Sequence, residues 1–188
     1  MDTARPQQIN NLLREGVVTE VDQTRARCRV RTGEVHTDFI PWLASAAGAL
    51  ITWAPPSVGE QLLVLCGDGD IANAVALRGI YSEAFQAPSD SADVTLLRFA
   101  DGAVITYDSA AHALVAVLPA GGTVAITADG GVSINGPVTI NGETTITGNV
   151  SVTGTAKVSD DVIGGGISLK NHATTGVQPG SGKSGPPA

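Results

Sequence analysis

Hydrophobic and polar positions follow different rules in successive parts of this 188-residue chain. Apolar residues recur at helical spacing through residues 7–15, and Gly16 follows where a helix would end, so a short N-terminal helix is expected over residues 1–15. Residues 16–81 then alternate apolar and polar side chains, the pattern of β-strands. Five strands are expected, at residues 17–22, 25–31, 37–42, 60–66 and 73–80. Five short strands predict a small barrel.

A polar stretch rich in Ser, Ala, Asp and Pro follows Tyr81 and is typical of a linker. Beyond it, Asp101-Gly102 separates two strand-like segments, a strong hairpin signal. The strands expected in this part are residues 95–100, 104–108 and 112–118. Residues 82–129 are therefore predicted to form a linker and a collar of β-hairpins.

From Gly130 onward the chain repeats every six residues, and each block begins with glycine at 130, 136, 142, 148 and 154. The third and fifth residues of a block point to one side of an extended strand and are mostly β-branched, and the residue between them is polar. Each glycine is expected to let the backbone turn before the next strand. The predicted inward residues are Val132, Ile134, Val138, Ile140, Thr144, Ile146, Val150, Val152, Ala156 and Val158.

Two kinds of fold could bury this apolar side. A single-chain left-handed β-helix, as in the hexapeptide-repeat acyltransferases, needs three blocks for each coil, so five or six blocks would complete fewer than two coils. Three chains that each supply one side of a triangular prism would instead bury every inward residue on a shared axis. The repeat over residues 130–170 therefore predicts an intertwined homotrimer with a mechanical role.

The repeat is interrupted at Gly164-Gly165-Gly166, where Ile167 and Leu169 take the opposite parity. The chain is expected to change course there. Residues 171–188 are mostly Gly, Pro, Ser and Thr, a composition that is also typical of a disordered tail.

Composition limits the possible partners. Asp and Glu exceed Lys and Arg by 18 to 11, for a formal charge of −7, which repels a phosphate backbone. The start of the chain lacks a signal-peptide pattern, and no stretch has the roughly 20 apolar residues of a membrane span, so the chain is expected to be made in the cytoplasm. Cys28 and Cys66 lie among inward apolar residues and are expected to be reduced core residues.

One row of charged residues in the barrel region leaves two alternatives open. Arg25, Arg27, Arg29 and Arg31 fall on one side of the second predicted strand, where they form either a solvated face or a docking surface for an acidic neighbouring protein.

Catalysis is not indicated, because the histidines His36, His112 and His172 are scattered and no recognised catalytic motif surrounds them. Trp42 and Trp53 could stack on the bases of a single-stranded nucleic acid, but the net charge opposes this alternative.

Several short motifs follow one another in a specific order along nearly the whole chain. They are Gly16-Val17-Val18, Val21-Asp22, Ile40-Pro41-Trp42, Pro56-Ser57-Val58-Gly59-Glu60-Gln61, Asp101-Gly102, Tyr107-Asp108, Ser168-Leu169-Lys170-Asn171-His172 and Gly176-Val177-Gln178-Pro179-Gly180. With the repeat between them, they resemble the baseplate assembly protein V, or membrane-piercing spike, family of contractile phage tails and R-type pyocins.

This resemblance implies an all-β chain with an N-terminal OB-fold barrel at residues 16–81, a trimeric β-helix spike and a pointed apex at residues 171–188. It implies a structural spike that pierces the bacterial outer membrane when the sheath contracts. The implied partners are two further copies of the chain, tail hub and baseplate proteins at the barrel, and the target membrane at the apex. The implied location is the tail baseplate of a virion or bacteriocin particle.

The resemblance also bears on a metal site. Members of this family often carry His-x-His near the end, where six imidazoles from three chains hold an iron ion on the axis. This sequence has His172-Ala173-Thr174, so three His172 rings could fill at most one face of an octahedron. One iron ion per trimer at His172 and a metal-free apex of interlocked tails are the two alternatives, and the second is preferred.

Overall fold

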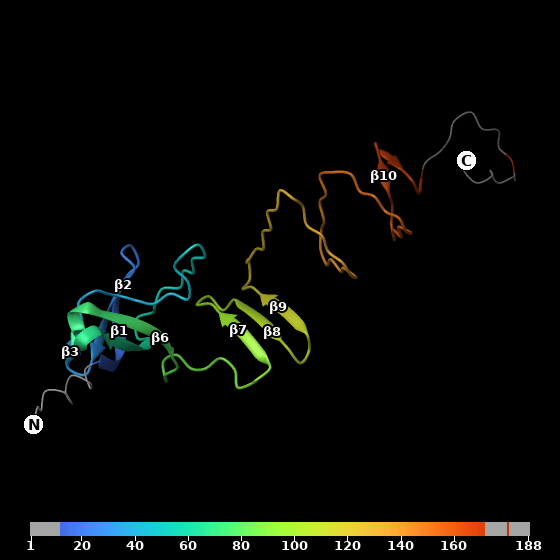
Figure 1. The fold of residues 1–188 in the computed structure, drawn as a ribbon. Helices are drawn as coiled ribbons and strands as arrows, with labels where there is room; N and C mark the ends of the chain where they lie inside the picture. Colours follow the sequence, from blue (N-terminus) through green and yellow to red (C-terminus); the bar gives the residue numbers. More distant parts are fainter. Residues whose placement is uncertain (1–11, 172–179, 181–188) are drawn as a thin grey trace, which may run out of the picture. The chain divides into compact units, whose positions relative to one another are not determined.

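The chain divides into two compact units, Met1–Ile126 and Thr127–Ala188. The computed structural model describes residues 12–171 and 180. The first unit holds a barrel and a three-stranded sheet, and the second holds the repeat and a short hairpin. Figure 1 shows these elements in chain order.

Six strands build the barrel as one sheet in the order β3-β2-β1-β5-β6, with β4 also paired to β2. They are β1 (Leu13–Asp22), β2 (Arg27–Thr32), β3 (Val35–His36), β4 (Ile40–Pro41), β5 (Gln61–Cys66) and β6 (Ala74–Ile80). Strand β1 pairs with β5 through its first half and with β2 through its second half. A parallel bridge between Trp42 and Ala76, with the Leu43 amide donating to the Ala76 carbonyl at 2.9 Å, joins the segment after β4 to β6 and closes the barrel.

The barrel core consists of the inward side chains of these strands. They are Val18, Cys28, Val30, Ile40, Leu62, Val64, Cys66, Ala74 and Ala76. The two cysteines are buried and unpaired, as predicted. Burial raises the pKa of Cys28 to about 11 and also raises that of Cys66, so both thiols are held in the neutral form.

The predicted helix over residues 1–15 is wrong at its C-terminal end, because Leu13, Arg14 and Glu15 belong to β1. These residues pair with β5, Leu13 opposite Leu65 and Glu15 opposite Leu63. Gly16 is not a helix stop. A Cβ atom there would lie 2.4 Å from Val30 Cγ1, so glycine allows β1 and β2 to approach closely. The start of the expected helix, residues 1–11, lies outside the described residues.

The second predicted strand also begins later than expected. Arg25 and Ala26 lie in a turn, where Ala26 has a φ of 51°, and β2 starts at Arg27. The predicted alternation holds from there, because Cys28 and Val30 are fully buried while Arg27 and Arg29 point away from the core.

The predicted collar is a three-stranded antiparallel sheet of β7 (Val94–Arg98), β8 (Val104–Asp108) and β9 (Ala113–Val117). Its first turn contains the Asp101-Gly102 pair, where the Asp101 carboxylate accepts the Ala103 amide at 3.0 Å and Gly102 has a φ of 91°. In the second turn the Asp108 carboxylate accepts the amides of Ala110 and Ala111 at 2.9 and 3.0 Å.

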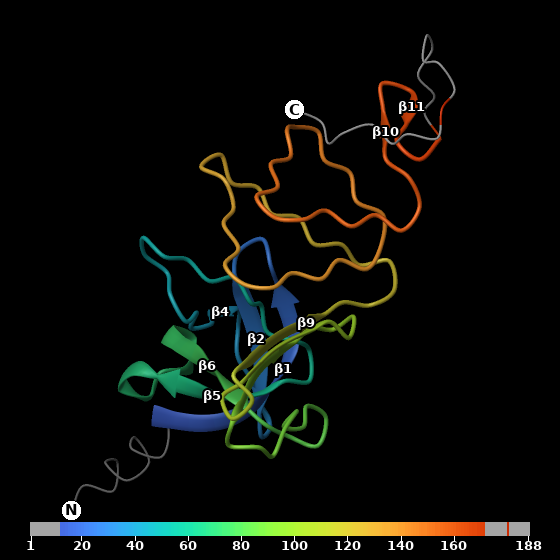
Figure 2. The same ribbon diagram turned by 90° about the vertical axis from the view of Figure 1, so that its right-hand side faces the viewer.

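In the second unit, the described residues 127–171 contain two strands, β10 (Ile163–Gly164) and β11 (Ile167–Ser168), which form an antiparallel hairpin. Figure 2 shows this pair following the long strand-free path of the repeat. Across the described part of the chain, no helix is long and apolar enough to cross a membrane.

Candidate assembly interface

The six-residue repeat bends at its glycines. Between residues 131 and 158 the chain bends at Gly136, Gly142, Gly148 and Gly154, with Thr153 sharing the last bend. Gly136 and Gly142 have φ values of 139° and 145°, which a residue with a Cβ atom rarely adopts. The predicted corners between extended segments are therefore present.

The inward side of the repeat has no cover within one chain. Its eight Val and Ile residues are 56–70% exposed, and Thr144 and Ala156 are exposed too. Every residue from Leu114 to Asp160 is in fact exposed. A segment this rich in β-branched residues is stable in water only when its apolar side is covered.

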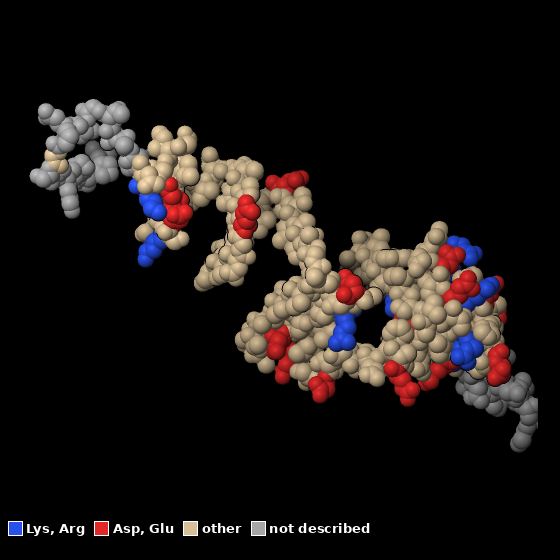
Figure 3. Space-filling model, turned by 180° about the vertical axis from the view of Figure 1, so that it is seen from behind, with Lys and Arg blue, Asp and Glu red and all other residues tan. Residues whose placement is uncertain are grey.

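Charged side chains are rare along this part of the chain. Residues 130–158 include only Glu143 and Lys157, and the residues between the inward positions are otherwise hydroxyl side chains. Figure 3 shows the contrast with the barrel, over which blue and red side chains lie close together. The outer side of the repeat is therefore polar but nearly uncharged.

The collar sheet has an exposed apolar side as well. Residues opposite one another in the register share a side, which places Leu97 beside Ile105 and Tyr107 beside Leu114. All four side chains are exposed, Leu114 most of all. An open three-stranded sheet with such a side also requires a covering layer.

Two of the four arginines of the row, Arg25 and Arg29, pair with acidic residues of the same chain. Arg29 contacts Glu20 at 3.3 Å and Asp38 at 3.2 Å, and Arg25 contacts Asp22 at 2.6 Å. The bond from Arg25 lowers the pKa of Asp22, and the Phe39 amide, with Arg29, lowers that of Asp38. The guanidinium groups of Arg29 and Arg25 also lie over the Phe39 ring, at 4.4 and 4.9 Å from its centroid, respectively. These contacts favour the solvated-face interpretation of the row.

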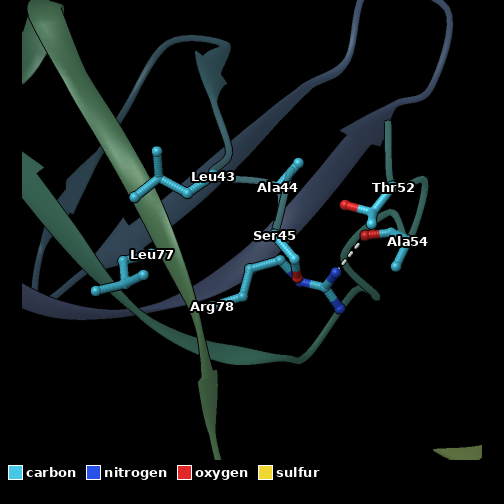
Figure 4. A pocket seen from close by; sticks show the side chains of 7 residues that line it. All are labelled: Leu43, Ala44, Ser45, Thr52, Ala54, Leu77 and Arg78. Atoms are coloured by element: carbon cyan, nitrogen blue, oxygen red, sulfur yellow. Dashed lines mark hydrogen bonds between the residues drawn. The ribbon is translucent and has the colours of Figure 1, made fainter. Parts of the chain in front are cut away.

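A cavity of about 240 Å³ lies where the loop after β4 meets β6. Figure 4 shows its lining side chains, which are Leu43, Ala44, Ser45, Thr52, Ala54, Leu77 and Arg78. The charged group among them, Arg78, is already paired with Glu60 through two bonds of 2.7 and 2.9 Å, and it also donates to the Ala54 carbonyl. Arg78 therefore anchors the loop to the barrel and is not free to act on a substrate.

The one predicted metal ligand, His172, lies outside the described residues, so the preferred metal-free apex and the iron alternative both stay predictions. Within the described part of the chain, no three His, Cys, Asp or Glu side chains come together as a metal site. His36 is in β3 and His112 is in the turn before β9, where its φ is 52°.

Sequence reasoning missed the group that organises the hairpin after the repeat. The Asp161 carboxylate accepts the amides of Val162 and Lys170 at 2.8 and 2.9 Å, and the Ser168 hydroxyl also donates to it. These bonds, led by the Ser168 hydroxyl, lower the pKa of Asp161. The Gly165-Gly166 pair was the available signal, because consecutive glycines favour a two-residue hairpin turn.

Comparison with known proteins gives matches at both ends of the chain. Residues 14–81 match the family described as the Type VI secretion system/phage-baseplate injector OB domain, and residues 166–188 match the GpV apex motif. The chain is similar to the spike protein of Escherichia phage P2, with 43% identity over 125 residues. That alignment covers 66% of this chain and 58% of the P2 protein.

The two matches agree with the structure. The injector OB domain coincides with the closed barrel, and the apex motif begins within the hairpin that follows the repeat. An OB domain at one end, an apex motif at the other and 43% identity to a phage spike over 125 residues together make this chain similar to the baseplate spikes of phage tails.

Proposed function

We propose that this chain is the trimeric spike at the tip of a contractile tail, and that it pierces the bacterial outer membrane mechanically when the sheath contracts. One observation carries the proposal: every residue from Leu114 to Asp160 is exposed in a single chain, although the segment alternates apolar and polar residues throughout its repeat. The two family matches and the similarity to a phage spike support the tail-tip location, and the exposed repeat supports the trimer.

The backbone of the repeat is evidence for a trimer as strong as its side chains are. In the described residues 118–162, no segment forms a strand with another, so the peptide groups of the repeat lack the ladder that its β-branched composition favours. Two neighbouring copies would supply both the ladder and the cover for the inward residues from Val132 to Val158. Folding of the repeat would then require assembly.

The role proposed is structural and not catalytic. The cavity beside β6 contains a charged group that is already paired, and the outer side of the repeat consists mainly of hydroxyl side chains. A narrow trimeric rod with few charges has little to offer a chemical reaction but suits passage through a membrane, because few charged groups must be desolvated.

The barrel is the proposed contact with the tail hub and the baseplate, and the apex is the proposed contact with the target membrane. Because acidic residues of its own chain already hold Arg25 and Arg29, we expect the hub to bind elsewhere on the barrel. The loop held by Arg78 exposes Leu50, Ile51 and Trp53 and is the better candidate.

How the apex is held together is a separate proposal, in which the metal-free apex is preferred and iron is the alternative. Three His172 imidazoles could hold one iron ion per trimer, and interlocked tails could hold the apex without it. Elemental analysis of the purified trimer, with His172→Ala as the control, distinguishes the two. One metal per trimer that is lost in the variant would establish the iron site.

The proposed function can be tested in the contractile particle that carries the chain. Particles whose spike lacks residues 130–171 should still contract but should no longer admit a chromogenic periplasmic substrate into target cells. Intact purified spike, incubated with murein, should release no soluble fragments. Equal permeabilisation by intact and truncated particles would contradict the mechanical role, and release of murein fragments would contradict the non-catalytic one.

A further inference from the structure

The hairpin that follows the repeat has two different sides. Its register places Gly164 opposite Ile167 and Ile163 opposite Ser168, and the Leu169 amide donates to the Val162 carbonyl at 2.8 Å. Residues opposite one another share a side, so Val162, Ile167 and Leu169 lie together, and with Gly164 they line most of a hollow of about 380 Å³. The other side carries Asp161, Ile163, Ser168 and Lys170.

The hairpin explains why the parity of the apolar residues changes. Gly165 and Gly166 have φ values of 58° and 83°, the positive values that a two-residue type I′ turn requires. Val162 has the even parity of the inward residues of the repeat. The turn brings Ile167 and Leu169, which have odd parity, back to the side of Val162. The inward side of the repeat therefore continues onto the hairpin without a break.

The repeat cannot determine its own alignment between chains. Because its blocks are six residues long, a slip of one block keeps every inward residue inward, and Val or Ile again meets Val or Ile. Only Thr144 and Ala156 would distinguish one alignment from the next. An element outside the repeat must therefore set the register.

From these features, and resting on the proposed trimer, we propose that the hairpin at residues 161–170 is the registration element of the spike. Its apolar side packs against the same side of two other copies and aligns the three repeats. This hairpin is the part of the described second unit that already has paired strands in one chain.

Asp161 is the residue that prepares the hairpin for this contact. Its carboxylate joins Val162, the residue before β10, to Ser168 and Lys170 near β11. The ion pair between Lys170 and Asp160 at 3.3 Å is exposed to solvent and contributes little to the hairpin. These bonds lie on the side away from Val162, Ile167 and Leu169. The chain thus presents the apolar side in a formed state before any partner arrives, which lowers the ordering cost of association.

Two isoleucines of the hairpin give a matched test of the contact. Ile163 and Ile167 are 71% and 66% exposed in one chain, but they lie on opposite sides. Under oxidising conditions, Ile167→Cys should form disulfides between chains of the assembled protein, because such bonds need Cα atoms within about 7 Å. Ile163→Cys should form none. Equal cross-linking in both variants, or none in Ile167→Cys, would overturn the contact. The second result would assign this side to solvent or to the chain's own C-terminal residues.

Registration itself is tested by refolding from denaturant. Asp161→Ala should slow trimer formation by about tenfold, because the hairpin must then be ordered during association, whereas the neighbouring Asp160→Ala should refold as the parent does.

A nitroxide attached to Thr139→Cys after assembly reports the alignment of the three chains, since a slip of one block displaces the label by up to about 20 Å. The parent should give one narrow set of distances and Asp161→Ala several.

Unchanged rate and unchanged distances in Asp161→Ala would overturn the registration role even if the protein is a trimer. A parent protein that stays monomeric would instead contradict the proposed function as well. The two failures are therefore distinguishable.

Discussion

The barrel strands and the six-residue repeat share the same alternation of apolar and polar residues, but only the barrel buries its apolar side within one chain. In the barrel, β1 is long enough to pair with both β2 and β5, so the sheet closes and encloses Val18, Val30 and Leu62. In the repeat, a glycine interrupts the strand every six residues, and no segment finds a partner among the described residues 118–162. Alternation therefore predicts which side is buried, whereas strand length and closure decide how many chains are needed.

The largest expected effect is the loss of assembly when a charge is placed on the axis of the repeat. Ile140→Asp would bring three carboxylates together on the axis, and an unpaired buried charge costs several kcal/mol, so assembly should be lost. The neighbouring Thr139→Asp, on the outer side, should assemble normally. Size-exclusion chromatography with light scattering measures the native mass of both variants. Equal assembly of the two would contradict the assignment of inward and outward sides.

A cavity in the barrel core should lower the stability of the barrel without any effect on assembly. Leu62 is fully buried, and Leu62→Ala should lower the free energy of unfolding of the barrel by about 2–5 kcal/mol. Both tryptophans of the chain, Trp42 and Trp53, lie in or beside the barrel, so their fluorescence during urea unfolding reports this unit. Loss of the trimer in Leu62→Ala would show that the two regions are not independent.

Arg78 should contribute less to the stability of the barrel than the core residue Leu62 does. Arg78→Met removes the paired bonds to Glu60 and the bond to the Ala54 carbonyl, and should cost about 1.5–3 kcal/mol of barrel stability. The loop at residues 44–54 should also become the first site of limited proteolysis. Arg25→Met, at an exposed ion pair, is the control and should change stability by at most about 1 kcal/mol.

The smallest expected effect is the acid sensitivity of the hairpin. Because the pKa of Asp161 is lowered from 3.8 in the folded chain, its stabilising effect is complete above pH 3.8 and is lost as the pH falls through the lower folded value. The difference in refolding rate between the parent and Asp161→Ala should therefore be constant from pH 7 to pH 5. Below about pH 3.8 it should shrink. A difference that keeps the same size at every acid pH at which the protein refolds would show that Asp161 acts through something other than its charge.

Local pattern was sufficient to predict most of the strands. The alternation over residues 60–66, 73–80 and 104–108 gives β5, β6 and β8 within one residue at each end. Gly16 shows where local pattern fails. The glycine that resembles a helix stop is required by Val30, fourteen positions away, and such a contact is visible only after the strands are paired.

The candidate interface was predictable in part. The inward positions of the repeat follow from the sequence, as do its corners at glycine. The role of Asp161 does not, because its partners Ser168 and Lys170 reach it only after the turn at Gly165 and Gly166 reverses the chain. The same turn changes which parity faces inward. In the sequence Ile167 and Leu169 therefore depart from the even parity of the repeat, although in the structure they continue its inward side.

The native mass of the purified full-length chain tests the central claim most directly. The account predicts a single species of three times the 19.0 kDa chain mass that persists on dilution, because the repeat has no cover except from other copies. A stable, folded species at 19.0 kDa would contradict it.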